Sequence, residues 1–462
     1  MRETTYIRQL NRQQRLMPFA MPWIKRNRIL ILFYIMTTFS RFPATDGEDI
    51  VNARTNWQTG AKTDFWGGIS TLIYGHFPSF IFNWQTSIVF IQVTLTFIAL
   101  TFIRGKSANG VTVQRLTFYL TSYCALVFSS QTTRDGLMFS LVLFAVSLLL
   151  LAIAEGTCNK YQLVIGLIIL IFGLSLRPWV SIAALPVVIY VASKSFDSKR
   201  GWIIALLAIT VVAGPVSLEA LSASAQHLEK SYPEQQVMIM DYAASYCWTN
   251  NPATGLLARK GLSLFSSNPL YPDSACQLFR ADTWLSLVKS QNESAKNMTS
   301  DFSLIQPGDY IKYMNARNGW LEMIIHDPVT YLQNRMQFAT KLLIGSDSRN
   351  IRFLSAKGFN ERLKNVYFIP YDGLVSLHLF SLIAIFGYIT FVALFRKFKH
   401  RVTYLILTGP ELLIIATLGL WTLVSSIAYI GSNGRYTYTA TLASLVIWSG
   451  INLSTHSSEL ND

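Results

Sequence analysis

The chain has 462 residues, of which 51% are hydrophobic and only 14% are charged, and its formal net charge is +14. A soluble domain typically carries about 25% charged residues, so most of this chain does not face water. The basic residues lie in short segments between apolar blocks rather than on one surface, which is typical of the positive-inside rule and argues against nucleic acid as the partner.

Apolar blocks long enough to cross a bilayer as helices recur along the chain. We predict about ten spans, near residues 23–41, 81–103, 116–131, 136–154, 161–176, 179–193, 202–219, 374–395, 404–430 and 437–452. With the N-terminus in the cytoplasm, the inside loops hold most of the basic residues, and one orientation satisfies every loop. The sequence therefore predicts a mainly α-helical, polytopic membrane bundle with both termini in the cytoplasm.

Two long segments lie outside the cytoplasm in this topology. The first is an outer loop at 42–80, within an N-terminal transmembrane module at 1–219. The second is an extracytoplasmic domain at 220–373, whose Pro, Asn, Asp and Ser clusters are typical of a folded aqueous segment. C-terminal transmembrane helices follow at 374–462.

The extracytoplasmic domain contains Cys247 and Cys276. Theirs is the only pairing that the topology allows in an oxidising compartment, and two free thiols are the alternative. Near the end of the domain, residues 320–343 have apolar side chains at helical spacing. This spacing predicts helices that lie along the outer membrane surface, with helices of the domain core as the alternative.

The first outer loop carries three carboxylates within four residues, on Asp46, Glu48 and Asp49, and Asp64 follows in the same loop. A carboxylate at the membrane–water boundary can act as a general base toward a hydroxyl group. It can also hold a divalent cation such as Mg²⁺ or Mn²⁺, although nothing in the sequence demands one. The alternative is a solvated acidic turn at the end of the first span.

Three short outer turns each hold an arginine, where the positive-inside rule disfavours it. Arg134-Asp135 opens an apolar span, Arg177 lies between two spans, and Arg435-Tyr436 precedes the last span. Arginine suits phosphate because its guanidinium group donates two parallel hydrogen bonds, and for Arg177 we expect a phosphate or a carboxylate partner. A helix cap with a snorkelling side chain is the alternative for the first pair. Together, these cations and the first-loop acids suit an anionic lipid headgroup and a base that works at the outer leaflet.

Taken in order, these motifs resemble the GT-C superfamily of membrane glycosyltransferases, in a bacterial branch that uses polyprenyl-phosphate sugars. The matching elements are Pro43 with Asp49, Asp64-Phe65-Trp66, Arg134-Asp135, Arg177, the segment His326, Pro328, Tyr331, Leu332 and Arg335, and Arg435-Tyr436. The chain departs from the pattern in three places: the first loop lacks a His-Pro pair after Trp66, Pro178-Trp179 replaces the usual neighbours of Arg177, and Asp327 is inserted before Pro328. The layout is also similar to that of the serotype-converting glucosyltransferases of bacteriophages.

The resemblance implies sugar transfer from a polyprenyl-phosphate donor to a glycan or glycolipid acceptor, on the outer face of the bacterial cytoplasmic membrane. Asp49 would be the catalytic base, Asp46 is its main rival, and Glu48 lies between them. The large domain would hold the acceptor. The implied donor-phosphate ligands are Arg134, Arg177, Arg335 and Arg435, and the implied supporting residues are Asp64, Asp135 and Tyr436.

Two other classes of protein fit parts of the pattern. An O-antigen-type polymerase shares the outer arginines and the large outer loop, but it does not need a first-loop carboxylate. A transporter or flippase of lipid-linked sugars typically has inverted repeats and broken helices at the midplane. Neither feature is evident in this sequence, and its polar residues gather at the outer face, so we expect an enzyme.

Overall fold

The computed structural model describes residues 22–39, 48–59, 67–104, 112–130, 133–153, 159–196, 201–232, 234–266, 274–279, 302–344 and a few positions between 416 and 447. Within these segments the named regular elements are all helices, so the predicted mainly α-helical class is confirmed. Most of the predicted C-terminal transmembrane region lies outside the described residues.

Four described segments are long and apolar enough to cross a membrane. They are α4 (Trp84–Arg104), α6 (Arg134–Ile153), the 3₁₀ segment η2 (Pro178–Ala184) continued by α8 (Leu185–Ser195), and α9 (Gly201–Ala225). Shorter apolar stretches lie in α5 (Thr112–Ser129) and α7 (Lys160–Ser175), and residues 22–39 are helical as well. These helices support a membrane protein, but they do not establish the predicted total of about ten spans.

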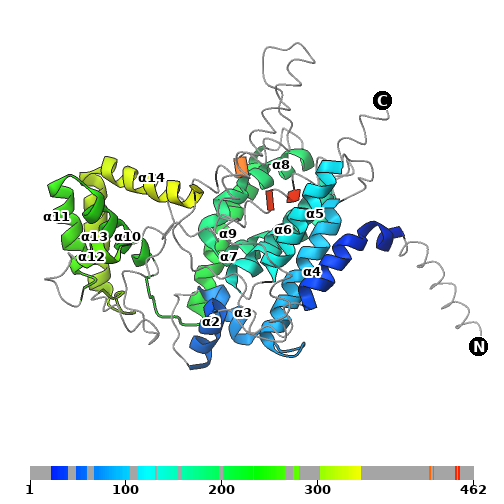
Figure 1. Ribbon diagram of the computed structural model, residues 1–462, viewed down its shortest axis with the longest axis horizontal. Helices are drawn as coiled ribbons and strands as arrows, with labels where there is room; N and C mark the ends of the chain where they lie inside the picture. The colour runs from blue at the N-terminus through cyan, green and yellow to red at the C-terminus, as the bar shows by residue number, and fades with distance from the viewer. Residues whose placement is uncertain are drawn as a thin grey trace, which may run out of the picture.

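Helix α6 lies in the middle of the bundle and packs most extensively against α4 and α7 (Figure 1). Two glycines of α7 make the close approach to α6 possible. A Cβ atom on Gly166 would lie 2.9 Å from Leu149 Cδ2, and one on Gly173 would lie 2.9 Å from Leu141 Cβ. Small residues at a helix interface are typical of membrane bundles, because they let the two backbones approach and gain van der Waals contact.

The predicted first outer loop contains two helices, α2 (Glu48–Thr59) and α3 (Gly68–His76), which pack against each other. Arg54 of α2 donates hydrogen bonds to the carbonyl oxygens of Tyr74 (3.2 Å) and Phe77 (3.1 Å). Its guanidinium carbon also lies 4.7 Å from the ring centroid of Trp84, at the start of α4. Arg54 therefore fastens α2 to the end of α3 and to the first turn of the following span.

Helix α9 is longer than the sequence predicted, since it continues beyond residue 219 to Ala225. The added residues are Ala, Leu and Ser, with no Pro or Gly, so the helix has no local reason to stop. Glu219, which ended the predicted apolar span, is held by the N-terminus of α3. The C-terminal end of α9 therefore packs against α3, as part of the bundle.

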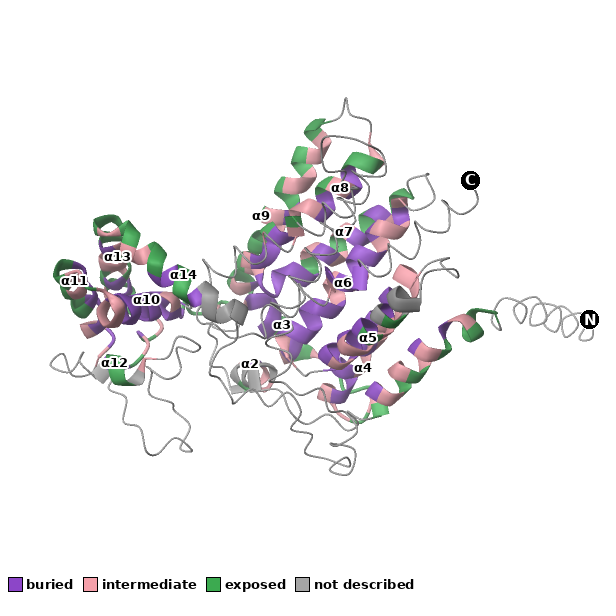
Figure 2. Ribbon diagram, turned by 45° about the horizontal axis from the view of Figure 1, so that its top comes forward, coloured by how far each residue is buried: buried purple, intermediate pink, exposed green. Residues whose placement is uncertain are grey.

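A second group of helices has a core of its own. It contains α10 (Gln235–Trp248), α11 (Pro252–Ser263), α12 (Ser274–Leu278), α13 (Tyr310–His326) and α14 (Pro328–Ile344). Figure 2 shows that α10 is buried along most of its length, while the helices around it have exposed faces. Cys247 of α10 and Cys276 of α12 form a disulfide, with their Cα atoms 5.4 Å apart.

Tyr242 of α10 lies at the centre of this second core. It is fully buried, and its hydroxyl group donates to the carbonyl oxygen of Ala316 in α13 at 2.7 Å. Gly261 of α11 packs directly on its ring, because a Cβ atom there would lie 2.0 Å from Tyr242 Cε1. The aromatic ring thus sets the spacing of three helices, and α11 needs a glycine at the point of contact.

Asp327 lies at the junction between α13 and α14. Its carboxylate accepts hydrogen bonds from the backbone nitrogen (3.0 Å) and hydroxyl group (2.7 Å) of Thr330, in the first turn of α14. It also accepts from the Thr254 hydroxyl group (2.8 Å) and the Asn251 amide (2.9 Å), at the start of α11. The Thr330 backbone donor, followed by the two hydroxyl groups, holds the pKa of Asp327 below its ordinary value.

We expect Asp327→Ala to lower the stability of the second helix group at pH 7 by about 1 kcal/mol, as the loss of a helix N-cap does. A carboxyl group with a lowered pKa stabilises the fold fully above its unfolded pKa of about 3.9, and this contribution is lost as the pH falls through the folded pKa. The difference between wild type and variant should therefore shrink below about pH 4. Thermal unfolding from pH 7 to pH 3 checks this expectation. Asp327→Asn, which keeps a capping oxygen, is the matched control, and a pH-independent difference would contradict the role of the charge.

Candidate functional site

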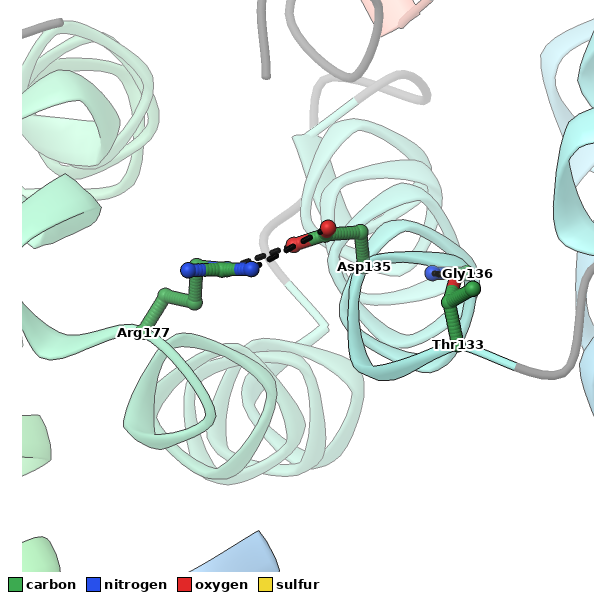
Figure 3. A network of polar contacts seen from close by, with 4 residues as sticks. All are labelled: Thr133, Asp135, Gly136 and Arg177. Atoms are coloured by element: carbon green, nitrogen blue, oxygen red, sulfur yellow. Dashed lines mark hydrogen bonds and ion pairs between the residues drawn. The ribbon is translucent and has the colours of Figure 1, made fainter. Parts of the chain in front are cut away.

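The first turn of α6 holds two of the predicted site residues. Thr133 precedes the helix, and its hydroxyl oxygen accepts a hydrogen bond from the Gly136 backbone nitrogen at 3.1 Å (Figure 3). This side-chain cap satisfies one of the unpaired donors at the helix start. Arg134 and Asp135 are thereby fixed in the first turn of α6, with Asp135 buried and Arg134 partly buried.

Arg177 lies at the break between α7 and the 3₁₀ segment. Because the residue before a proline is disfavoured in the α conformation, Arg177 lies outside the helical region, with φ −147° and ψ 78°. From this position the Nε atom of Arg177 donates to Asp135 Oδ1 at 2.5 Å, and its Nη2 atom donates to Asp135 Oδ2 at 3.1 Å. Figure 3 shows the two side chains facing each other between α6 and the end of α7.

The Asp135–Arg177 pair is bidentate and nearly excluded from solvent, with 4% and 9% of the two residues exposed. A buried ion pair adds little net stability, but removing one partner leaves an uncompensated charge in an apolar surrounding. The sequence placed Asp135 beside Arg134, whereas the structure pairs it with Arg177, 42 residues further along the chain. Arg177 therefore has a carboxylate partner within the protein, which is one of the two kinds of partner expected for it.

The C-terminal end of α9 makes a third contact that the sequence did not predict. Glu219 accepts hydrogen bonds from the backbone nitrogens of Gly68 and Ile69, the latter at 3.0 Å, and so caps α3 from another helix. Gly67 has φ +86°, and a Cβ atom there would lie 2.8 Å from Glu219 Oε1. The only local signal was the Gly-Gly pair at 67–68, since the Glu219 partner is about 150 residues away.

Gln226 reinforces the junction between α9 and α3. Its side-chain nitrogen donates to the Gly68 carbonyl oxygen at 2.8 Å and to two oxygens of Ser222, also at 2.8 Å. A Cβ atom on Gly68 would lie 2.4 Å from the backbone nitrogen of Ala223, so the two backbones are in direct contact. The first outer loop is therefore braced on the bundle through its α3 helix.

The ion pair and the braced loop lie toward the same end of the bundle, where α6 begins and α7 ends (Figure 1). Ser181, just after Arg177 in η2, donates to the Val212 carbonyl oxygen of α9 at 3.4 Å. Glu219 is seven residues further along α9, a rise of about 10 Å. The junction with α3 thus lies roughly 10 Å beyond the level of Ser181, toward the end of α9.

Glu48 and Asp49 form the start of α2 in this same loop. They therefore begin a helix rather than an irregular turn, although their side chains lie outside what the structure describes. Asp46, Asp64 and the pair Arg435-Tyr436 also fall outside the described residues. Among the described residues there is no group of three or more His, Cys, Asp or Glu side chains that could hold a metal ion.

Arg335 lies in the second helix group and not in the bundle. Its Nη2 atom is 2.5 Å from Asp241 Oδ2, and only 4% and 1% of the two side chains are exposed. The Trp320 indole nitrogen donates to the same carboxylate oxygen at 3.0 Å. Complete burial raises the pKa of Asp241, and the Arg335 charge opposes that shift.

Two aromatic rings complete the surroundings of Arg335. Its guanidinium carbon lies 5.5 Å from the ring centroid of Tyr331 and 5.7 Å from that of Phe338. Cation–π contacts of this kind are strongest where water is excluded. The burial and the partners of Arg335 argue against its direct contact with a donor phosphate and favour a role in the core of this helix group.

Comparison of the chain with protein-family models, with characterised proteins and with solved structures returned no match, so its function is inferred from its own residues.

Proposed function

We propose that this chain is a membrane glycosyltransferase, which moves a sugar from a polyprenyl-phosphate donor to a glycan or glycolipid of the cell envelope. The reaction would take place on the outer face of a bacterial cytoplasmic membrane. One observation carries the proposal: the acidic first outer loop is folded and braced on the same end of an apolar bundle that holds Arg134 and the Asp135–Arg177 pair.

The proposed reaction uses Asp49 as its general base. The carboxylate takes the proton of an acceptor hydroxyl group, whose oxygen attacks the anomeric carbon of the donor sugar. The bond between that carbon and the phosphate oxygen breaks, and the polyprenyl phosphate leaves with the bonding electrons. Asp46 is the rival base, and Glu48 and Asp64 would shape the acidic surroundings.

The leaving phosphate needs positive charge where its negative charge develops. Arg134, in the first turn of α6, and Arg435, beside Tyr436 in the predicted final outer turn, are the proposed ligands. Arg177 would act mainly through its pair with Asp135, which fixes the start of α6 against the end of α7. A Mg²⁺ or Mn²⁺ ion at the acidic loop would add a Lewis acid for the same charge, but the proposed steps do not require it.

The base assignment predicts a large loss of activity for Asp49→Asn. General base catalysis typically contributes about 10²–10⁴-fold, so transfer should fall by at least about 100-fold. The measurement is mass analysis of envelope glycans and lipid-linked sugars in cells that lack the protein, complemented with wild type, Asp49→Asn or Asp46→Asn. Cells without the protein, and cells complemented with Asp49→Asn, are expected to lose one sugar and to accumulate its polyprenyl-phosphate donor. The wild-type chain should restore both.

Asp309→Asn is the matched control, because Asp309 caps α13 through the Lys312 backbone nitrogen and asparagine caps equally well. Full activity of both first-loop variants would refute the base assignment. Shortened glycan chains with every sugar still present would favour the polymerase class. Donor that stays on the inner leaflet would favour a flippase.

A further inference from the structure

The exposed apolar side chains of the second helix group are concentrated on two of its helices. Eight large hydrophobic residues are exposed in the described part of residues 234–344, and seven of them belong to α13 or α14. The seven are Tyr310, Ile311, Leu321, Ile325, Val329, Leu332 and Met336, and the eighth is Leu256 of α11. This helix group already has a core of its own. The concentration of exposed apolar side chains on α13 and α14 therefore indicates an interaction surface rather than a solvent-facing one.

On α14 these residues form a continuous stripe. Val329, Leu332 and Met336 are separated by three and four positions, which places them on one face of the helix. They are 60–66% exposed. The opposite face holds Asn334, Arg335 and Phe338, which are buried in the core. A helix between a protein core and water normally has a polar outer face, so α14 is apolar where solvent contact alone would favour polar residues.

The stripe continues across the junction at Asp327 onto the end of α13. Ile325 is 78% exposed, and Leu321 lies one turn before it. Gln333 and Gln337 are exposed beside the stripe on α14, so its polar border is formed by uncharged amides. This arrangement of an apolar face with a polar edge is typical of helices that lie in the plane of a membrane interface.

The chain itself brings this surface to the membrane. Helix α9 ends at Ala225 and α10 begins at Gln235, and the nine residues between them span at most about 35 Å. The bundle helices expose apolar side chains of the same kind, such as Ile168 of α7 and Ile209 of α9, on faces suited to lipid. Beyond α14, the chain leads to the predicted span at 374–395. The second helix group therefore remains within reach of the bilayer surface at both ends.

We propose that the end of α13 and all of α14 lie in the outer leaflet, at the boundary between headgroups and acyl chains. Leu321, Ile325, Val329, Leu332 and Met336 face the lipid, and the buried face of α14 carries the rest of the domain. This surface would hold the extracytoplasmic domain down on the membrane, at a fixed height beside the bundle. The proposal depends on the membrane character of the chain and not on the proposed transferase reaction.

Nitroxide spin labels test the proposal in the full chain. Labels are attached at Leu332→Cys or Met336→Cys on the stripe, and at Gln333→Cys or Gln337→Cys as matched controls on the same helix. Cys124 and Cys158 are replaced by alanine, and the Cys247–Cys276 disulfide is kept. In nanodiscs of phosphatidylethanolamine and phosphatidylglycerol, the collision rates of each label with oxygen and with a water-soluble nickel chelate are compared.

Labels on the stripe are expected to meet oxygen more often and the nickel chelate less often than the control labels, because oxygen concentrates in lipid. Nickel access at 332 and 336 equal to that at 333 and 337 would place the stripe in water and overturn the proposal. Exclusion of both reagents would mean that protein covers the stripe, either a second copy or another segment of the chain, and would overturn it as well. All four positions are exposed, so labelling leaves the core contacts of α14 intact.

Discussion

Arg335→Leu is expected to destabilise the whole α10–α14 group rather than to weaken a binding site. The side chain of Arg335 is 4% exposed and that of its partner Asp241 is 1% exposed. Removing the arginine leaves a buried carboxylate with the Trp320 indole as its remaining described donor. Breaking a buried ion pair in this way costs about 3–5 kcal/mol, a large part of the stability of a domain of this size.

The double variant Asp241→Leu with Arg335→Leu separates the two roles of the arginine. Replacing both charges by apolar side chains of similar volume is often neutral or stabilising, so the double variant should regain most of the lost stability. Arg317→Leu on the exposed side of α13 is the control and should change little. Hydrogen exchange of α10 and α14 in the purified full chain measures the effect. A single variant with normal protection but weaker donor binding would restore Arg335 to the list of phosphate ligands.

Hydropathy predicted the described spans well because it depends on local sequence. Helix α4 was expected at 81–103 and covers Trp84–Arg104, and α6 was expected at 136–154 and covers Arg134–Ile153. The end of α9 was missed by six residues for a physical reason. A glutamate at the end of an apolar block is typical of a membrane boundary. Glu219 instead accepts hydrogen bonds from the backbone of α3, and no local pattern encodes this contact.

Partners of charged residues were harder to predict than the residues themselves. Asp135 and Arg134 are adjacent in sequence, yet neighbouring residues on a helix point in different directions. The actual partner, Arg177, depends on how α6 packs against α7. Arg335 was predicted as a site residue because of its place in a motif. Its partner Asp241 is 94 residues away in the sequence, on α10, and the two side chains meet inside the core of the second helix group. Its aromatic neighbours at 331 and 338 were the one local sign of burial.

Asp135→Leu is expected to destabilise the membrane bundle by about 3 kcal/mol, because it leaves the Arg177 charge without its carboxylate in an apolar interior. Arg177→Leu should have a similar effect, since it leaves the Asp135 carboxylate in the same position. The double variant removes both charges and should regain most of the stability. Ser140→Ala is the control, since it removes only neutral hydrogen bonds, one from Thr96 (3.2 Å) and one to the Gly136 carbonyl oxygen (2.8 Å). The bond between the two helices is expected to contribute about 0.6 kcal/mol. Unfolding of the purified chain by titration with SDS, followed by helix content, measures all four.

The double variant also tests how Arg177 contributes to the proposed reaction. If the pair only fixes α6 against α7, a refolded double variant should transfer sugar at nearly the wild-type rate. If Arg177 also meets the donor phosphate, the double variant should be stable yet slow, because no cation remains at the break before Pro178. Equal stability of both single variants and wild type would contradict the buried pair itself. The charge at 177 would then be stabilised by some other group, and the start of α6 would be fixed by the Thr133 cap without help from Arg177.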